Sequence, residues 1–251
     1  EVEQRGRATM AAASAVLSNS HAAVATYRAD GYEGRFTVLG TGVDIGRARS
    51  LRAGPDRGDV RRRLGIGPEE RLLVWPASVW PVKGQAALVA ALAAVRPRYP
   101  ELGCALVGQA DAGYGGALAA FLERHGLDRA VRLLPFHDDL RPWWAAADAV
   151  VCPSESEALP AAVLEAMAQG LPALCTRVGD LPRLVEPGVT GWLCDPSDVA
   201  SLAAGLEAVA TTPPEQLALM GAAAARTVAA AHEWTAVLAR TADLLRTVAG
   251  R

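Results

Sequence analysis

The chain has 251 residues, of which 51% are hydrophobic, 21% charged and 5% aromatic, and its net charge is −2. This composition can form a buried core for one domain and part of another. The small net charge gives no electrostatic basis for a nucleic-acid partner, and no stretch reaches the roughly 18 apolar residues of a membrane span.

The predicted elements alternate between short β-type runs and Ala- and Leu-rich stretches of helical period. Strands are expected at residues 15–17, 36–39, 72–75, 105–107, 131–134, 149–152, 173–175 and 192–194. Helices are expected at residues 85–95, 116–125, 161–169, 199–209 and 215–231. This order predicts an α/β fold with a doubly wound, mostly parallel sheet. Such folds bind ligands at the carboxyl ends of their strands.

The composition divides the chain into segments. Residues 41–70 are interpreted as a linker, because "GTGVD" is followed by a cluster of Gly, Pro and Arg. Residues 1–40 are too few for a domain and are expected to be the tail of one. The sheet restarts near Leu72. The Arg-rich stretch Arg57 to Arg63 also carries acidic residues, so a solvated helix face is favoured over a binding patch.

Cysteines, histidines and tryptophans give mostly structural predictions. Each cysteine lies in or beside an apolar run and none forms a C-x-x-C pair, which favours buried free thiols in a reducing compartment: Cys104, Cys152, Cys175 and Cys194. No two histidines have metal-ligand spacing with a nearby carboxylate or thiolate, so no metal site is expected. Four tryptophans are expected to pack rather than to bind sugar: Trp75, Trp80, Trp143 and Trp144.

The most informative segment is residues 153–172, "PSESEALPAAVLEAMAQGLP", which follows the apolar run "AVVC". Pro160 suits the first position of a helix, and Gly170 followed by Pro172 suits its end. Ala158 and Leu159 are poor N-caps. The amides of residues 161–163 therefore have no obvious partner, and an open helix start is a site for phosphate. The alternative is that Ser156 or water caps these amides.

Two glutamates, Glu157 and Glu165, lie on either side of this helix start, eight residues apart. They could bracket a ligand, with one carboxylate before the helix and one along its side. The spacing alone indicates little, because exposed glutamate is common in helices.

The residues from Pro153 to Asp198, "PSESEALPAAVLEAMAQGLPALCTRVGDLPRLVEPGVTGWLCDPSD", closely resemble the signature of group 1 retaining glycosyltransferases (family four) with its E-x7-E motif. The resemblance continues in order through "LSNSHAAVATY", "FTVLGTGVD", "PASVWPVKGQAALVAAL", "LVGQA" and "VRLLPFHDDLRPWWAAADAVVCPS". It covers nearly the whole chain, and that co-linearity is more specific than any single motif.

The resemblance implies the GT-B architecture, in which two Rossmann-like domains face a cleft. The C-terminal domain of that family binds the nucleotide sugar, and the N-terminal domain mainly binds the acceptor. By this interpretation residues 71–232 form the nucleotide-sugar-binding domain and residues 1–40 are a remnant of the acceptor-side domain. Residues 233–251 would be a C-terminal helix returning toward that domain, most of which is missing from the chain.

The resemblance also implies a role for each matching residue. Glu165 would accept hydrogen bonds from the ribose hydroxyls, and two residues would be catalytic. Glu157 would contact the transferred sugar near the reacting centre, and Lys83 would neutralise the diphosphate. Backbone groups would line the sugar, phosphates and base at Leu159, Pro160, Ala161, Ala162, Phe136 and His137.

The implied reaction is glycosyl transfer with retention of configuration, without a metal or cofactor. The donor would be a UDP-, GDP- or ADP-linked sugar, and the acceptor a glycan, a lipid or a small molecule. A cytoplasmic protein is expected, with the inner membrane surface left open as a partner. This chain is expected not to catalyse transfer by itself.

Several positions depart from the family pattern. Ser78 stands five residues before Lys83, where the family has a phosphate-binding arginine, and serine cannot make a bidentate charged contact. Arg177 or Arg183 could compensate for this loss. Ala158 replaces a usual glycine, which matters only if the position needs positive φ. Two alternatives therefore stay open: a sugar-nucleotide epimerase of similar architecture, and a non-catalytic, degenerate donor-binding module.

Overall fold

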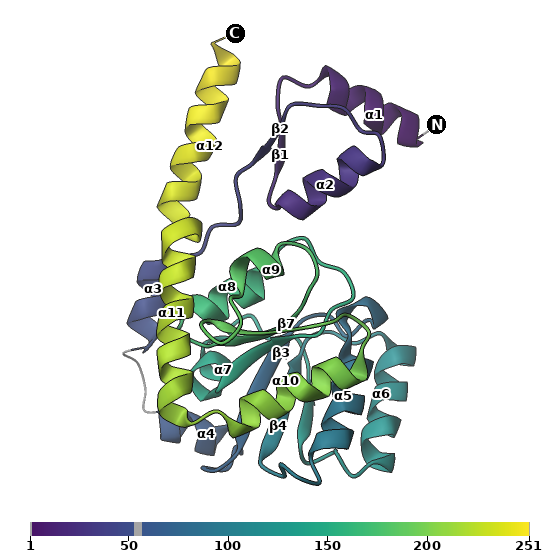
Figure 1. The fold of residues 1–251 in the computed structure, drawn as a ribbon, viewed down its shortest axis with the longest axis vertical. Helices are drawn as coiled ribbons and strands as arrows, with labels where there is room; N and C mark the ends of the chain where they lie inside the picture. Colours follow the sequence, from purple (N-terminus) through teal and green to yellow (C-terminus); the bar gives the residue numbers. More distant parts are fainter. Residues whose placement is uncertain (1, 53–56, 251) are drawn as a thin grey trace.

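The computed structural model describes residues 2–52 and 57–250, which form a large α/β unit and a smaller one above it (Figure 1). The large unit contains the predicted doubly wound sheet. Its six strands are all parallel, in the order β5-β4-β3-β6-β7-β8. They are β3 (Arg71–Pro76), β4 (Leu102–Val107), β5 (Val131–Leu134), β6 (Ala149–Cys152), β7 (Ala173–Thr176) and β8 (Gly191–Cys194).

The six predicted strands of this sheet are confirmed, and two of them, β5 and β6, have the predicted bounds. Every residue of β4, β6 and β7 is buried, as expected for parallel strands that helices cover on both faces. The strand order reverses beside β3: β4 and β5 lie on one side of it, and β6 to β8 on the other. The loops after β3 and β6 therefore diverge at a topological switch point, where open α/β sheets bind their ligands.

Helices cover the sheet (Figure 1). The five predicted helices are confirmed, with ends shifted by up to four residues, as α5 (Gln85–Val95), α6 (Ala112–Arg124), α8 (Ala161–Ala168), α10 (Val199–Thr211) and α11 (Pro214–His232). Sequence patterns missed the short helices α7 (Arg141–Ala146) and α9 (Leu181–Leu184). Both are too short for a helical period to show. Leu164 and Met167 of α8 are fully buried in the core, as the period of that segment predicts.

The smaller unit contains α1 (Val2–Ala12), β1 (Val16–Ser18), α2 (His21–Ala29) and β2 (Phe36–Val38). The two predicted strands form a parallel pair, with Val16 opposite Phe36. Neither helix was predicted. The start of α2 is fixed by Ser20, whose Oγ accepts the Ala23 amide at 2.9 Å.

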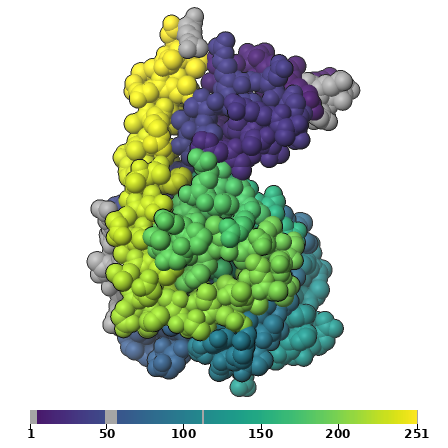
Figure 2. Space-filling model, in the orientation of Figure 1, coloured from purple at the N-terminus to yellow at the C-terminus, as the bar shows by residue number. Residues whose placement is uncertain are grey.

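The segment interpreted as a linker is partly helical; a helix was expected at Arg57 to Arg63, but the one before it was not predicted. It contains α3 (Ile45–Arg52) and α4 (Arg57–Arg63), while residues 53–56 lie outside the described part. The chain crosses between the units twice, and the crossings pair with each other. The Val43 amide donates to the His232 carbonyl at 2.7 Å, and the Trp234 amide donates to the Val43 carbonyl at 3.0 Å. The final helix, α12 (Trp234–Ala249), then runs along the smaller unit (Figures 1 and 2).

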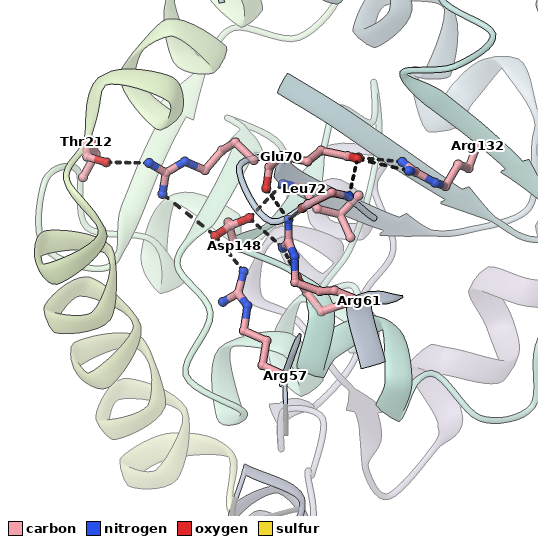
Figure 3. Close-up of polar contacts among 10 residues, drawn as sticks. Arg57, Arg61, Glu70, Leu72, Arg132, Asp148 and Thr212 are labelled. Carbon is pink, nitrogen blue, oxygen red and sulfur yellow. Dashed lines mark hydrogen bonds and ion pairs between the residues drawn. The ribbon is translucent and has the colours of Figure 1, made fainter. Parts of the chain in front are cut away.

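The expectation that Arg57 to Arg63 form a solvated face is wrong for Arg61, which is only 5% exposed. Its guanidinium donates to the carbonyls of Ala146 and Gly67, each at 2.7 Å, and to that of Glu70 (Figure 3). Asp148 lies 3.5 Å from the same group and accepts the Leu72 amide at 2.8 Å. The network joins α4 to the amino end of β3, at the end of the sheet opposite the switch point.

All four cysteines are free and buried, as predicted. Burial raises the pKa of the Cys104 thiol well above its ordinary value and that of Cys194 to about 12, which makes both thiols poor nucleophiles. The prediction that the tryptophans pack holds for Trp75, Trp143 and Trp144 but is wrong for Trp80, which is 53% exposed. In the described residues, no helix combines the length and apolar character needed to cross a membrane.

Candidate donor site

Lys83 and Glu157 meet at the switch point. Lys83 ends a short turn, Pro81–Lys83, that follows β3, and Glu157 lies in the loop between β6 and α8. The Lys83 Nζ is 2.7 Å from the Glu157 Oε1, although the residues are 74 positions apart. The Glu157 side chain is only 11% exposed. Lys83 is also the single lysine among the 25 basic residues of the chain.

The backbones of the two loops touch beside this ion pair. Gly84 has φ +71°, and a Cβ atom there would lie 1.9 Å from the carbonyl oxygen of Pro153. The Glu155 amide donates to the Val82 carbonyl at 2.9 Å, which ties the two loops together. Only glycine satisfies both the positive φ and the close approach. The position of Lys83 therefore depends on the residue that follows it.

Serine and lysine together orient the Glu157 carboxylate. The buried Ser154 hydroxyl donates to the same Oε1 atom at 2.9 Å, and its own carbonyl accepts the Thr176 hydroxyl at 2.6 Å. The carboxylate is thus held from the ends of two neighbouring strands. An ammonium has three N–H donors, so the contact with Glu157 leaves Lys83 able to donate to an anionic ligand as well.

The start of α8 has no side-chain cap, which supports the predicted open helix start in part. Ser156 is exposed, and no side chain hydrogen-bonds at the N-cap. Pro160 is the N-cap and not the first helical residue as predicted, so the helix begins one residue later, at Ala161. The expectation is wrong for the Val163 amide, because it donates to the Pro160 carbonyl at 3.1 Å. The amides of Ala161 and Ala162 remain at the positive end of the helix without a capping side chain.

The loop before α8 is supported by the turn after β7. Gly179 has φ +56°, and a Cβ atom there would lie 2.4 Å from the carbonyl oxygens of Glu157 and Ala158. The Asp180 amide donates to the Ala158 carbonyl at 2.9 Å. Ser197 alone among the described non-glycine residues has positive φ. The change from glycine to Ala158 therefore causes no backbone strain.

A cavity at the ends of β3, β4 and β5 brings together three of the predicted donor-binding residues. Its volume is about 220 Å³, and Ser78, Phe136, His137 and Leu140 contribute to its lining. The Ser78 carbonyl accepts a hydrogen bond from the side-chain amide of Gln85 at 3.0 Å. The arrangement can hold a flat ring between backbone edges and the exposed Phe136 side chain.

Glu165 lies in a neighbouring cavity of about 260 Å³, which shares Leu140 with the first and is also lined by Asp44, Arg47 and Trp144. The side chain is exposed inside this hollow. Even so, surrounding atoms desolvate the carboxyl and raise its pKa above the ordinary value, and the positive charge of Arg47 opposes this effect.

Three other residues singled out in the sequence do not line the cavity of Ser78. Leu159 is buried and lines a separate cavity between the two units. Arg183 lines that same cavity, and Arg177 is 3.4 Å from Asp195. Neither arginine lines the cavity of Ser78, so the structure shows no replacement there for the family's phosphate-binding arginine.

Sequence reasoning missed Ser154, Arg47 and Asp180. Ser154 stands in the quoted motif, but nothing in the sequence indicates that it binds Glu157. Arg47 falls in the segment interpreted as a linker.

The described residues contain no group of three or more His, Cys, Asp and Glu side chains able to hold a metal.

Comparisons with known proteins show the family of this chain. A model of the family described as "Glycosyl transferases group 1" matches residues 70–212, which is more than half of the chain. A D-inositol 3-phosphate glycosyltransferase of Actinosynnema mirum is 35% identical over 73% of this chain and 45% of its own length. One from Catenulispora acidiphila is 33% identical over 88% of this chain and 52% of its own length. The chain thus spans about half the length of these curated relatives.

Solved structures show the same fold. Anabaena HepE in complex with UDP and glucose superposes with a TM-score of 0.83 at 28% identity, covering 93% of this chain and 63% of HepE. Sucrose-phosphate synthase of Thermosynechococcus elongatus, at 24% identity, superposes with a TM-score of 0.85 over 98% of this chain and 61% of its own. These are GT-B structures. From the family match and this shared fold, the chain belongs to the group 1 glycosyltransferases.

Proposed function

We propose that this chain is the donor-binding half of a retaining glycosyltransferase that uses a nucleotide-diphosphate sugar. One observation carries the proposal: the single lysine, Lys83, contacts Glu157 at 2.7 Å at the switch point. Glu157 lies in the loop that leads into α8, and the start of α8 has no side-chain cap. A cation and a positively polarised helix start suit a diphosphate.

In this proposal each group has one task. The Ala161 and Ala162 amides and the Lys83 ammonium bind the diphosphate, and Glu157 contacts the transferred sugar. The Glu165 carboxylate accepts hydrogen bonds from the ribose hydroxyls in its own cavity. The base occupies the cavity of Phe136 and His137. The two cavities share Leu140, which supports a continuous path for one extended ligand.

The proposed reaction breaks the bond between the anomeric carbon and the phosphate oxygen. The acceptor oxygen forms its bond to the same face of that carbon, and the leaving phosphate takes the acceptor's proton. Negative charge therefore develops on the diphosphate, where Lys83 and the start of α8 stabilise it. No metal ion takes part in this scheme.

A UDP-linked hexose is the first donor to test, because HepE has been solved with UDP and with UDP-glucose. We expect calorimetry to detect UDP-glucose binding to this chain. Removing a charge-assisted contact costs about 1.5–3 kcal/mol, so we expect Lys83→Ala to weaken binding by about tenfold or more. Lys83→Arg keeps the charge and should lose less.

Arg62→Ala is the matched control, because Arg62 is an exposed cation that pairs with Asp59 on α4. It should leave the affinity unchanged. The absence of binding to UDP-, GDP- and ADP-linked sugars would contradict the proposal and favour the degenerate module that Ser78 suggests. Conversion of the free donor without transfer, in a protein that also carries the acceptor-side half, would favour an epimerase.

A further inference from the structure

The carboxylate of Asp180 crosses between the two units and caps a helix of the smaller one. Its Oδ2 atom accepts the His21 amide at 2.7 Å, and its Oδ1 atom accepts the Ala22 amide at 2.9 Å. Asp180 is only 7% exposed, and it lies 158 positions from Ala22 along the chain. Together with Ser20, which accepts the Ala23 amide, it satisfies the first turn of α2.

The starts of α2 and α8 therefore differ. At α8 no side chain caps the amides of Ala161 and Ala162. At α2 the positive end of the helix already holds an anion, and that anion belongs to the protein. Helix starts attract phosphate and carboxylate groups, so an external anion can reach the α2 amides only by displacing Asp180.

A cavity of about 340 Å³ lies beside this contact, between the units. Its lining includes Asn19, His21, Asp180, Arg183, His232 and Arg240. The Arg240 guanidinium donates to the carbonyls of Leu39 and Ala231, each at 3.2 Å. The lining thus combines the buried Asp180 carboxylate with other hydrogen-bonding groups and with two exposed arginines, Arg183 and Arg240.

We propose that Asp180 determines the acceptor class, so that this cavity takes an acceptor through neutral hydroxyl groups and rejects one that presents a phosphate to α2. This rests on the proposed transferase function and deepens it. A phosphate beside the carboxylate would meet a like charge, and a phosphate in its place would leave Asp180 buried without its two donors. Curated relatives at 32–35% identity are named for an inositol phosphate, and Asp180 argues against extending that acceptor to this chain.

Inorganic phosphate is the probe for this proposal, titrated into the 251-residue chain with backbone amide signals followed by NMR. In the wild type we expect the His21 and Ala22 amides to be protected from hydrogen exchange and unaffected by phosphate. In Asp180→Gly we expect exchange at these two amides to be at least about tenfold faster, and their signals to shift saturably with phosphate. Asp180→Asn, which keeps the shape and loses the charge, covers the case in which the glycine variant fails to fold.

Three results would overturn the proposal. The first is a phosphate-dependent shift of the His21 and Ala22 amides in the wild type. The second is a lack of phosphate response in folded variants of Asp180. The third is phosphate binding by the wild type that Arg183→Gln or Arg240→Gln abolishes, because the cavity would then accept an anion through its arginines. Binding of UDP-glucose is measured separately, so a failure of the proposed function is distinguishable from a failure at Asp180.

Discussion

At the scale of single residues, the proposed donor site depends on charged groups whose positions are fixed by their neighbours. Glu157 is nearly buried and receives hydrogen bonds from Lys83 and Ser154. Leaving such a carboxylate without a partner would destabilise the folded protein. The pair therefore fixes the geometry of the site before any ligand arrives, and this reduces the entropy lost when a ligand binds.

Lys83→Ala is accordingly expected to lower stability as well as affinity. It leaves the Glu157 carboxylate with one of its two hydrogen bonds, at a cost of about 1–3 kcal/mol. The double variant Lys83→Ala with Glu157→Gln should recover part of this loss, as urea denaturation can measure. Equal stability of the single variant and the wild type would show that the ion pair does not organise the loop.

Glu165 should affect stability and binding in opposite directions. Surrounding atoms partly desolvate its carboxyl and raise its pKa, so the folded chain takes up this proton at a higher pH than the unfolded chain does. The group favours folding below the ordinary carboxyl pKa, and that contribution is lost as the pH rises through the raised pKa. At neutral pH, Glu165→Gln should therefore be slightly more stable than the wild type, and this advantage should disappear in acid.

The same variant should bind a nucleotide diphosphate about tenfold more weakly, because a neutral amide accepts hydrogen bonds from ribose less strongly than a carboxylate does. Thermal unfolding at two pH values and calorimetry would check the two effects. Unchanged nucleotide affinity would remove Glu165 from the site.

At the scale of elements, the approach of the β3 and β6 loops depends on Gly84. Gly84→Ala introduces a Cβ atom that meets the Pro153 carbonyl, in a backbone with positive φ. We expect this substitution to lower the free energy of unfolding by more than about 2 kcal/mol. Gly116→Ala is the control, because this helical glycine of α6 has open space around it. Alanine there should raise the free energy of unfolding by at most about 1 kcal/mol. A tolerated Gly84→Ala would contradict the close contact.

The network around Arg61 predicts a loss of stability without a loss of binding. Arg61→Leu leaves the carbonyls of Ala146 and Gly67 and the Asp148 carboxylate short of a donor, at a cost of about 3 kcal/mol. The network lies at the amino end of the strands, and Glu157 lies at their carboxyl end, so nucleotide affinity should stay the same. Arg62→Leu, on the exposed side of α4, should change little. A reduced nucleotide affinity of folded Arg61→Leu would show that the two ends of the sheet are coupled.

At the scale of the whole molecule, sequence patterns predicted the elements better than the contacts between them. The apolar run at β6 and the Ala- and Leu-rich run at α5 have the predicted bounds, because burial on the sheet determines both. The segment around α3 and α4 was interpreted as a linker because Gly46, Pro55 and several arginines resemble loop composition. Arg61 connects α4 to Ala146 and Asp148, which lie 85 and 87 positions further along the chain, and no local pattern records these contacts.

The candidate site shows the same limit. The uncapped start of α8 was predicted from Ala158 and Leu159, because capping is a local property. The contact between Lys83 and Glu157 follows from the strand order at the switch point, and the contact between Asp180 and α2 from the position of the smaller unit. Neither can be read from spacing.

We also expect the 251-residue chain to bind a donor without transferring its sugar. It spans about half the length of its curated relatives, and α12 exposes Trp234, Leu238 and Leu245. Such an apolar face is typical of a surface that contacts another segment. Incubation with UDP-glucose and a panel of acceptors should give no glycosylated product, and transfer by this chain alone would contradict the expectation.

The single lysine allows a direct test of the central claim that Lys83 and the start of α8 bind the diphosphate. Lysine labelled with ¹⁵N gives a single side-chain Nζ signal in this chain, and the Ala161 and Ala162 amides can be followed in the same titration with UDP-glucose. We predict that the lysine signal and both amides shift together and saturate at one affinity. Binding of UDP-glucose that leaves all three signals in place would contradict the account.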